Sequence, residues 1–226
     1  MKTLDNGWVR YWEERTEKDD DYYGKKGSNA DDIIKFLQIK GKDNVLDIGC
    51  ANGSHLTDIE RKTNAKCYGI DISPIAKKLN KNKKIKLKLG DMEDTKYESG
   101  FFDKVFSLGV MEHTPRTEKT FKELNRIMKT KGLSYITVPN LYSFNHITKN
   151  IKMFFGKWEL GYERSFSKGQ AKRLLKKTGF KLEEFWIEPH RKTAHIFNWA
   201  DNSLNKVNNR FFGFFINMVI RKEREI

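Results

Sequence analysis

The chain has 226 residues, of which 38% are hydrophobic and 13% aromatic, enough for one globular domain with a sizeable core. Its formal charge of +14 would suit a nucleic acid or an anionic membrane as a partner. The lysines are spread along the chain without a long basic run, which favours a solvated lysine-rich surface. The two cysteines, Cys50 and Cys67, favour free thiols over a disulfide and have no metal-binding spacing.

Neither end of the sequence shows a targeting or membrane-spanning pattern. The first residues contain no apolar signal core, and the longest apolar run, Phe211 to Ile220, is shorter than the ~20 residues of a spanning helix. We therefore expect a cytoplasmic protein without a membrane span. The same run leaves peripheral membrane contact open, and no pattern indicates an oligomeric state.

The first predicted element is a helical segment within residues 1–27. Trp8, Tyr11, Trp12 and Arg15 follow helical spacing before three aspartates end the stripe. An aromatic stripe of this kind needs a surface to cover, and packing on the core is the favoured interpretation.

The strongest local pattern is a strand, a tight glycine-containing turn and a helix. An apolar run at 45–48 precedes turn-prone residues at 49–54 and a segment with Leu56 and Ile59 on one helical face. Such a turn lets backbone N–H groups approach a ligand at the positive end of the helix. The carboxylate of Asp47, just before the turn, would attract a ligand cation such as an amine. It disfavours a dinucleotide, for which the turn also lacks the G-x-G-x-x-G pattern.

Two further predicted strands also lead into an acidic residue. The strand at 65–70 is followed by Asp71, about 20 positions after the turn, where nucleoside-binding βαβ units carry the acid that binds the ribose hydroxyls. The strand at 84–89 alternates lysine with apolar residues, which suits a sheet edge, and leads to Asp91. Successive parallel strands therefore bring carboxylates to one edge of a sheet, as a nucleoside site requires.

Five stretches, in their order and spacing, resemble the successive motifs of class I S-adenosylmethionine (SAM)-dependent methyltransferases. They are VLDIGCANG, GIDIS, GDMEDT, FFDKVFSLGVMEHTP and LNRIMKTKGLSYITVPN. The likeness covers roughly residues 28–187 and is strongest to the small-molecule branch similar to the quinone-biosynthesis enzymes. It implies an α/β fold in one domain over residues 1–226: a doubly wound, mainly parallel, seven-stranded Rossmann-like sheet with a last antiparallel strand.

The remaining elements continue the alternation of strands and helices. We expect strands at 102–108 and 133–138 with a helix after Pro115 between them, a helix from Ser167, a strand at 179–187, a helix with a loop at 189–210 and the antiparallel strand at 211–221. Residues 139–165 interrupt this alternation on the ligand side of the sheet, with apolar residues at helical spacing. They form either a helical cap insertion over the acceptor or a satellite hydrophobic cluster, and the two weigh evenly.

The resemblance also implies a role for each residue at a matching motif position. The methionine end of SAM would be held by the turn residues Asp47, Gly49, Cys50, Ala51 and Gly53. The rest of the cofactor would contact Asp71 at the ribose, Ile72 and Met92 at the adenine ring, Asp91 at the adenine amino group, Leu108 and Gly109 beneath the methyl, and Tyr11 from the N-terminal segment. Ala51 departs from the family, which usually has glycine there, so positive φ is no longer available at little cost.

A general base is needed only if the acceptor must lose a proton. His113, preceded by Glu112, is the one histidine on a predicted ligand edge, and a neutral imidazole could take that proton. The alternative, slightly favoured, is that His113 orders the start of a helix or contacts the cofactor.

These features predict SAM-dependent transfer of a methyl group to an O, N or C atom of a small-molecule acceptor, with S-adenosylhomocysteine as the product. The aromatic residues in 139–165 favour an apolar or lipid-like acceptor. A nucleic-acid methyltransferase is one alternative, which the charge permits, although SLGVMEH stands where amino-methylating enzymes of that kind usually carry an Asn-Pro-Pro-Tyr-like motif. A non-catalytic SAM-binding protein is the other. We expect no metal and no specific nucleic acid.

Overall fold

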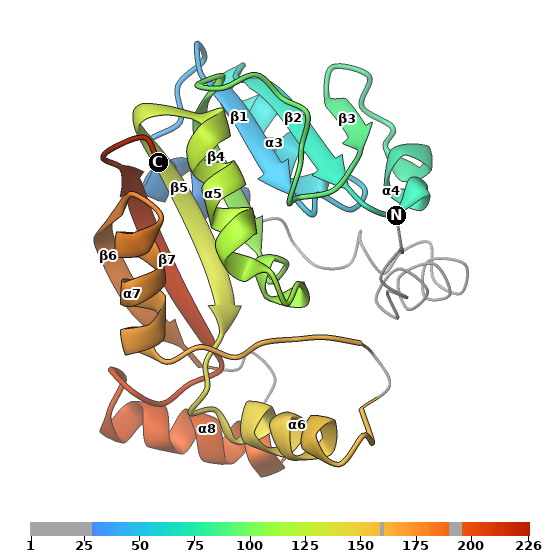
Figure 1. The fold of residues 1–226 in the computed structure, drawn as a ribbon. Helices are drawn as coiled ribbons and strands as arrows, with labels where there is room; N and C mark the ends of the chain where they lie inside the picture. The colour runs from blue at the N-terminus through green and yellow to red at the C-terminus, as the bar shows by residue number, and fades with distance from the viewer. Residues whose placement is uncertain (1–28, 159–160, 190–195) are drawn as a thin grey trace.

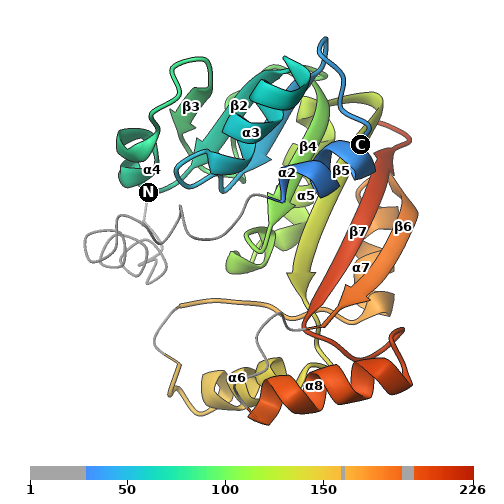
Figure 2. The ribbon, with the colours of Figure 1, turned by 180° about the vertical axis from the view of Figure 1, so that it is seen from behind.

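The structure is a computed structural model, and it describes residues 29–158, 161–189 and 196–226. Within these residues, seven strands form one twisted sheet in the order β3-β2-β1-β4-β5-β7-β6 (Figures 1 and 2). Their bounds are β1 Asn44–Ile48, β2 Lys66–Asp71, β3 Lys86–Leu89, β4 Phe102–Leu108, β5 Met128–Pro139, β6 Phe180–Glu188 and β7 Phe215–Lys222. The pairs among β1 to β5 are parallel, whereas β7 is antiparallel to both β5 and β6. The predicted fold class, with β3 at the edge and a last antiparallel strand, is confirmed.

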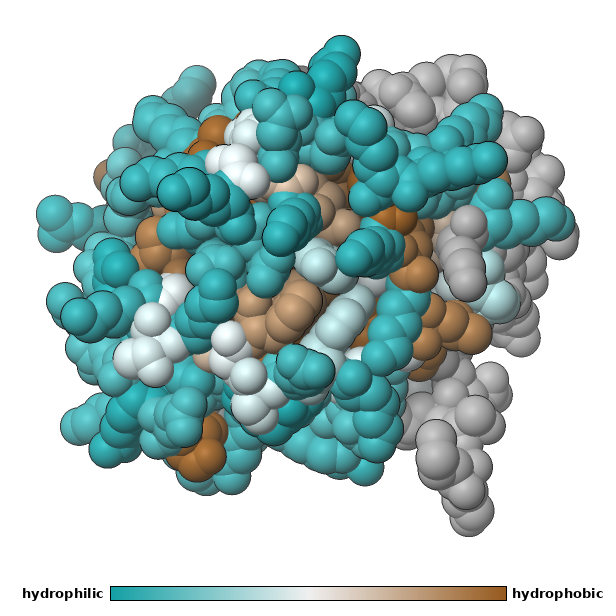
Figure 3. All heavy atoms as spheres, turned by 90° about the horizontal axis from the view of Figure 1, so that it is seen from above, coloured by the Kyte–Doolittle hydropathy of each residue, from teal (hydrophilic) through white to brown (hydrophobic). Residues whose placement is uncertain are grey.

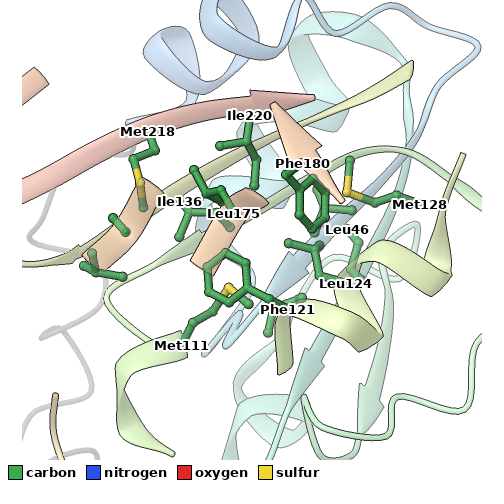
Figure 4. Close-up of a cluster of buried hydrophobic side chains, with 14 of the residues drawn as sticks. Leu46, Met111, Phe121, Leu124, Met128, Ile136, Leu175, Phe180, Met218 and Ile220 are labelled. Atoms are coloured by element: carbon green, nitrogen blue, oxygen red, sulfur yellow. The ribbon is translucent and has the colours of Figure 1, made fainter. Parts of the chain in front are cut away.

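Helices cover both faces of the sheet and enclose two hydrophobic cores. One face carries α2 (Ala30–Leu37) and α3 (Ser54–Thr63), and the other carries α5 (Thr117–Ile127) and α7 (Lys168–Lys177) (Figures 1 and 2). Figure 4 shows the second core, in which side chains of α5 and α7 meet those of the central strands. The short α4 (Pro74–Leu79) lies beside β3. No helix in the described ranges is both long and apolar enough to cross a membrane.

Two strands begin four or five residues from their predicted starts, whereas the other strand bounds agree with the prediction to within two residues. β5 begins at Met128 rather than at 133, because Met128 already pairs with Phe102 of β4 across a register shift. β7 begins at Phe215 rather than at 211, because the preceding residues form a turn. There the side-chain amide of Asn140 donates to the carbonyls of Phe211 and Gly213, each at 2.8 Å.

The carboxyl ends of β1 to β4 meet at one edge of the sheet, and the strand order reverses between β1 and β4. Ligands of open α/β sheets bind at such a switch point. Beyond this edge, at the carboxyl end of β5, lie α6 (Phe144–Phe154) and α8 (Ile196–Val207), packed side by side (Figures 1 and 2). The segment 139–165 therefore contains a helical insertion on the ligand side. Five of its apolar side chains are exposed: those of Phe144, Ile147, Ile151, Phe154 and Phe155. The cap over the acceptor and the satellite cluster stay as the two predictions for this segment.

The two outer helices are joined by a buried cap. Asp201 of α8 is fully buried and accepts from the Phe144 N–H at 2.7 Å, the Ser143 hydroxyl at 2.6 Å and the Asn145 side-chain amide at 3.0 Å. The first turn of α6 thus obtains its acceptors from a distant part of the chain, because the N-cap Ser143 makes no side-chain cap bond of its own.

We expect Asp201→Ala to lower the free energy of unfolding by about 2–4 kcal/mol, because three donors in a buried site lose their acceptor. Urea unfolding followed by circular dichroism measures this change. Glu98→Ala, which removes an exposed carboxylate, is the control and should leave the midpoint in place. An unchanged midpoint in Asp201→Ala would contradict the cap.

Candidate cofactor site

The turn between β1 and α3 is built from residues in the left-handed region. Gly49, Ala51 and Gly53 have φ of +78°, +46° and +76°. A Cβ at Gly49 would lie 2.3 Å from a methyl of Val110, so no side chain fits there. The Gly49 N–H donates to the Ile70 carbonyl of β2 at 2.8 Å, which ties the turn to the neighbouring strand. Residues 49–53 thus form a tight loop whose backbone lies at the edge of the sheet.

Ala51 adopts the conformation that glycine would adopt more cheaply. A left-handed L-residue costs roughly 1–2 kcal/mol, because Cβ crowds the following carbonyl. The backbone is held in place by its N–H, which donates to Asp71 Oδ2 at 2.9 Å. Where the family pattern has glycine, this turn therefore holds an alanine in the left-handed region at an energetic cost.

We expect Ala51→Gly to raise the free energy of unfolding by about 1 kcal/mol, because the strain disappears while the hydrogen bond remains. Ala200→Gly, inside α8, is the matched control. It should lower the same quantity by about 1 kcal/mol, because glycine weakens a helix interior. Chemical unfolding measures the change in the free energy of unfolding of each variant. A decrease in both variants, or an increase in both, would contradict the strain at Ala51.

Asp71 is the last residue of β2, and hydrogen bonds from the backbone hold its carboxylate in a fixed orientation. Its Oδ1 accepts from the Ser73 N–H at 2.8 Å, and its Oδ2 accepts from the Ala51 N–H. Burial raises the pKa of Asp71, and the backbone donors of Ser73, Ala51 and Ile72 partly oppose that rise. Each oxygen retains a second lone pair, so the oriented carboxylate can still accept from a diol. The side chain of the neighbouring Ile72 is 51% exposed, so a ligand ring could pack against it.

Asp47 lies in β1, next to β2, and is 4% exposed. Burial, with the charge of Asp71 added, raises the pKa of Asp47 well above its usual range. The turn residue Cys50 is also buried, and its thiol is free, as is that of Cys67. A buried carboxylate of this kind is stabilised in its charged form by a cation, and an amine bound at the turn would supply one.

Asp91 and Met92 follow β3 at the same edge. Asp91 is exposed and accepts from the Glu93 N–H at 2.8 Å, while Met92 is half-buried against the core. The buried Glu93 accepts from the Thr114 hydroxyl and forms an ion pair with Arg116 at 2.7 Å. This link between β3 and the start of α5 was not predicted, although Glu93 lies within the motif GDMEDT.

The end of β4 leads into a single 3₁₀ turn, η1 (Met111–His113). Leu108 is half-buried, and Gly109, at φ +71°, donates its N–H to the Thr137 carbonyl at 3.2 Å. Glu112 is 2% exposed, and among the described residues its Oε2 has no hydrogen-bond partner. Burial, with Glu163 nearby, raises the pKa of Glu112 well above its usual range. Burial therefore favours the neutral form of this carboxyl.

His113 and Glu112 are covered by the strap at 162–165, which returns from α6. The Nδ1 of His113 lies 3.4 Å from the Tyr162 carbonyl, and the Arg164 N–H donates to the Glu112 carbonyl at 3.1 Å. Burial lowers the pKa of His113, which keeps the imidazole neutral near pH 7. The distal part of the insertion therefore contacts the end of β4.

A buried ion pair holds this strap to α6, and the sequence contained no signal for it. Lys149 is 5% exposed, lies 2.7 Å from Glu163 Oε1, and donates to the Ser165 hydroxyl at 3.0 Å.

The structure thus brings the predicted residues from Asp47 to His113 to one sheet edge, whereas Tyr11 and the segment 1–27 lie outside the described residues. Within the described ranges, no three His, Cys, Asp or Glu side chains gather as a metal site would require.

A family model described as a methyltransferase domain matches residues 22–184. The chain belongs to this family. The family is one of SAM-dependent enzymes, so the expected class of domain and its cofactor are confirmed, as is the resemblance to class I methyltransferases. The matched range agrees with the part of the sequence that carried the motifs.

Two curated relatives show how far the likeness extends. The chain is 35% identical over 145 residues to an uncharacterized protein of Methanocaldococcus jannaschii, covering 58% of this chain and 55% of that protein. It is 27% identical over 154 residues to ajmaline N-methyltransferase of Rauvolfia serpentina, covering 65% and 47%. The chain thus matches about half the length of these relatives.

Among solved structures, the fold is similar to that of phosphoethanolamine N-methyltransferase 2 of Haemonchus contortus in complex with phosphomonomethylethanolamine and S-adenosylhomocysteine. The TM-score is 0.66 at 16% identity, covering 86% of this chain and 52% of that one. At this identity the likeness concerns the fold.

Proposed function

We propose that this chain transfers a methyl group from SAM to a small-molecule acceptor. The observation that carries the proposal is the pair of Asp71 and Asp47 at the ends of adjacent strands. Asp71 is an oriented acceptor for a diol, and Asp47 is a buried carboxylate that a cation would stabilise. SAM carries both a ribose diol and an ammonium group.

The residues present fit this cofactor. Asp47 would bind the ammonium, Asp71 the ribose hydroxyls, and Asp91 the adenine amino group, while Ile72 and Met92 offer apolar surface to the ring. When bound, SAM supplies an electrophilic methyl on its sulfonium. The contribution of the chain is to bind and orient the reactants in line and to exclude water.

The acceptor side is formed by the end of β4 and by the strap. A neutral His113, held at the Tyr162 carbonyl, would take a proton from an acceptor that has one to lose. Glu112 would act as a positioning residue, because its carboxyl is buried beneath the strap. The segment 139–165 would cap the acceptor through residues 162–165. The named substrates of the relatives, an alkaloid and a phosphorylated amine, support a small molecule as the acceptor.

The test is transfer of tritium from methyl-labelled SAM. A small-molecule extract should become labelled, while mixed RNA and DNA should bind only weakly and lose that binding steeply as salt rises. Strong label in nucleic acid would contradict a small-molecule acceptor. Normal SAM binding with no label in any fraction would favour a non-catalytic SAM-binding protein.

A further inference from the structure

The helix α6 has its polar face turned inward and its apolar face turned outward. Its buried residues are His146 and Lys149, which bond to the Asn140 carbonyl and to Glu163. At 100° per residue, the opposite side of the helix carries an apolar stripe. The stripe consists of Phe144, Ile147, Ile151, Phe154 and Phe155, exposed by 37%, 40%, 52%, 84% and 67%. The stripe therefore exposes three phenylalanines on a helix that buries a lysine, and among the described residues this apolar surface has no packing partner to cover it.

The stripe also shapes the surface around it. A shallow hollow of about 450 Å³ is lined by Ile147, Ile151, Phe154 and Phe155 of the stripe, together with Leu141, Tyr142 and Asn150. The ring of Tyr142 lies 6.4 Å from that of Phe211, just after α8, so the exposed apolar surface continues toward that helix. On α8 itself, Trp199 is 64% exposed.

Among the described residues around this surface, the exposed charges are all positive. Lys152 and Lys157 are exposed beside the stripe, and Lys206 and Arg210 are exposed at the end of α8 and beyond it. Across the described residues 140–158 and 199–213, the single acidic residue is Asp201, which is buried as the cap of α6. The opposite end of the molecule differs, because mainly hydrophilic side chains cover it (Figure 3).

We propose that the stripe of α6, with its flanking cations, docks on the surface of an anionic lipid bilayer. Aromatic and aliphatic side chains on one face of a helix enter the boundary between headgroups and acyl chains, and nearby lysines attract anionic headgroups. A protein partner would need a matching acidic apolar surface, whereas an anionic bilayer presents both features together. The inward polar contacts of Lys149 and Asp201 hold the helix in this orientation without help from the membrane.

The experiment is co-sedimentation of the full chain with vesicles, either of phosphatidylcholine alone or of phosphatidylcholine mixed with phosphatidylglycerol. The wild type should sediment with the mixed vesicles, more weakly at high salt, and hardly with phosphatidylcholine. Phe154→Ser with Phe155→Ser should weaken binding to mixed vesicles at least about tenfold, and Lys152→Glu with Lys157→Glu should do the same. Both double variants should retain the circular dichroism spectrum and the SAM affinity of the wild type.

Two matched controls separate docking from general effects. Lys42→Glu with Lys66→Glu changes the net charge equally at the opposite end of the sheet, where these exposed lysines precede β1 and begin β2. Ile226→Ser removes an exposed apolar side chain at the C-terminus, also at that end (Figure 1). Both should bind vesicles as the wild type does. Equal losses in the controls, or unchanged binding in the α6 variants, would overturn the proposal. A wild-type dimer that shows no vesicle binding, and that dissociates in the variant Phe154→Ser with Phe155→Ser, would also overturn it, because the stripe would then be a contact between copies.

Discussion

Asp47→Asn is expected to stabilise the ligand-free protein at neutral pH and, at the same time, to weaken SAM binding about a hundredfold or more. The buried carboxylate has a pKa raised well above its usual range, so its ionisation opposes folding. An uncharged amide of the same shape removes that cost and should raise the melting temperature by roughly 3–6 °C. The same amide cannot neutralise the ammonium of SAM, so cofactor affinity falls.

The pH dependence of this effect follows from the direction of the shift. Because the folded pKa lies above the unfolded one, the contribution of Asp47 to stability is fully present below the unfolded pKa and is lost as pH rises through the folded pKa. The advantage of Asp47→Asn should therefore be largest near neutral pH and should vanish below pH ~4, the ordinary value for aspartate. Thermal melts across this range measure it. A stability difference that grows toward acid pH would contradict the assignment, and Glu98→Gln serves as the exposed control.

Asp71→Ala is expected to cause an equally large loss of SAM affinity, but with the opposite effect on stability. The backbone donors of Ala51 and Ser73 lose their acceptor, which should lower the free energy of unfolding by about 1–3 kcal/mol. The loss should exceed what is gained by removing a carboxylate with a raised pKa, because the strained conformation of Ala51 depends on this bond. Calorimetric titration with SAM and chemical unfolding measure the two quantities.

A second substitution separates the two roles of Asp71. Adding Ala51→Gly to Asp71→Ala should restore part of the stability, because glycine holds the turn without the anchor. It should not restore SAM binding, because the ribose hydroxyls still have no acceptor. Recovery of affinity in the double variant would show that Asp71 acts only by shaping the turn.

The edge of the sheet that carries the site could be predicted from the sequence, because its determinants are local. Asp47, Asp71 and Asp91 each follow or end an apolar run, and the carboxyl ends of parallel strands meet at one edge. The same holds for α7, which begins at its N-cap Ser167 as predicted: the Ser167 hydroxyl accepts from the Gln170 N–H at 3.2 Å, and the Gln170 side chain accepts from the Ser167 N–H at 2.9 Å. Both partners lie within one turn of helix, so no tertiary contact is needed to form them.

The tertiary structure alone decided which way α6 faces. Its sequence shows an apolar stripe, and a stripe by itself predicts burial. The orientation is set instead by contacts across long stretches of chain: Asp201 caps the helix from α8, and Lys149 pairs with Glu163 on the returning strap. Such buried polar contacts are favourable only when both partners meet in the folded protein, so no local sequence pattern predicts them. The burial of Glu112 beneath the same strap has the same origin, because the pKa of a carboxyl is set by what packs around it.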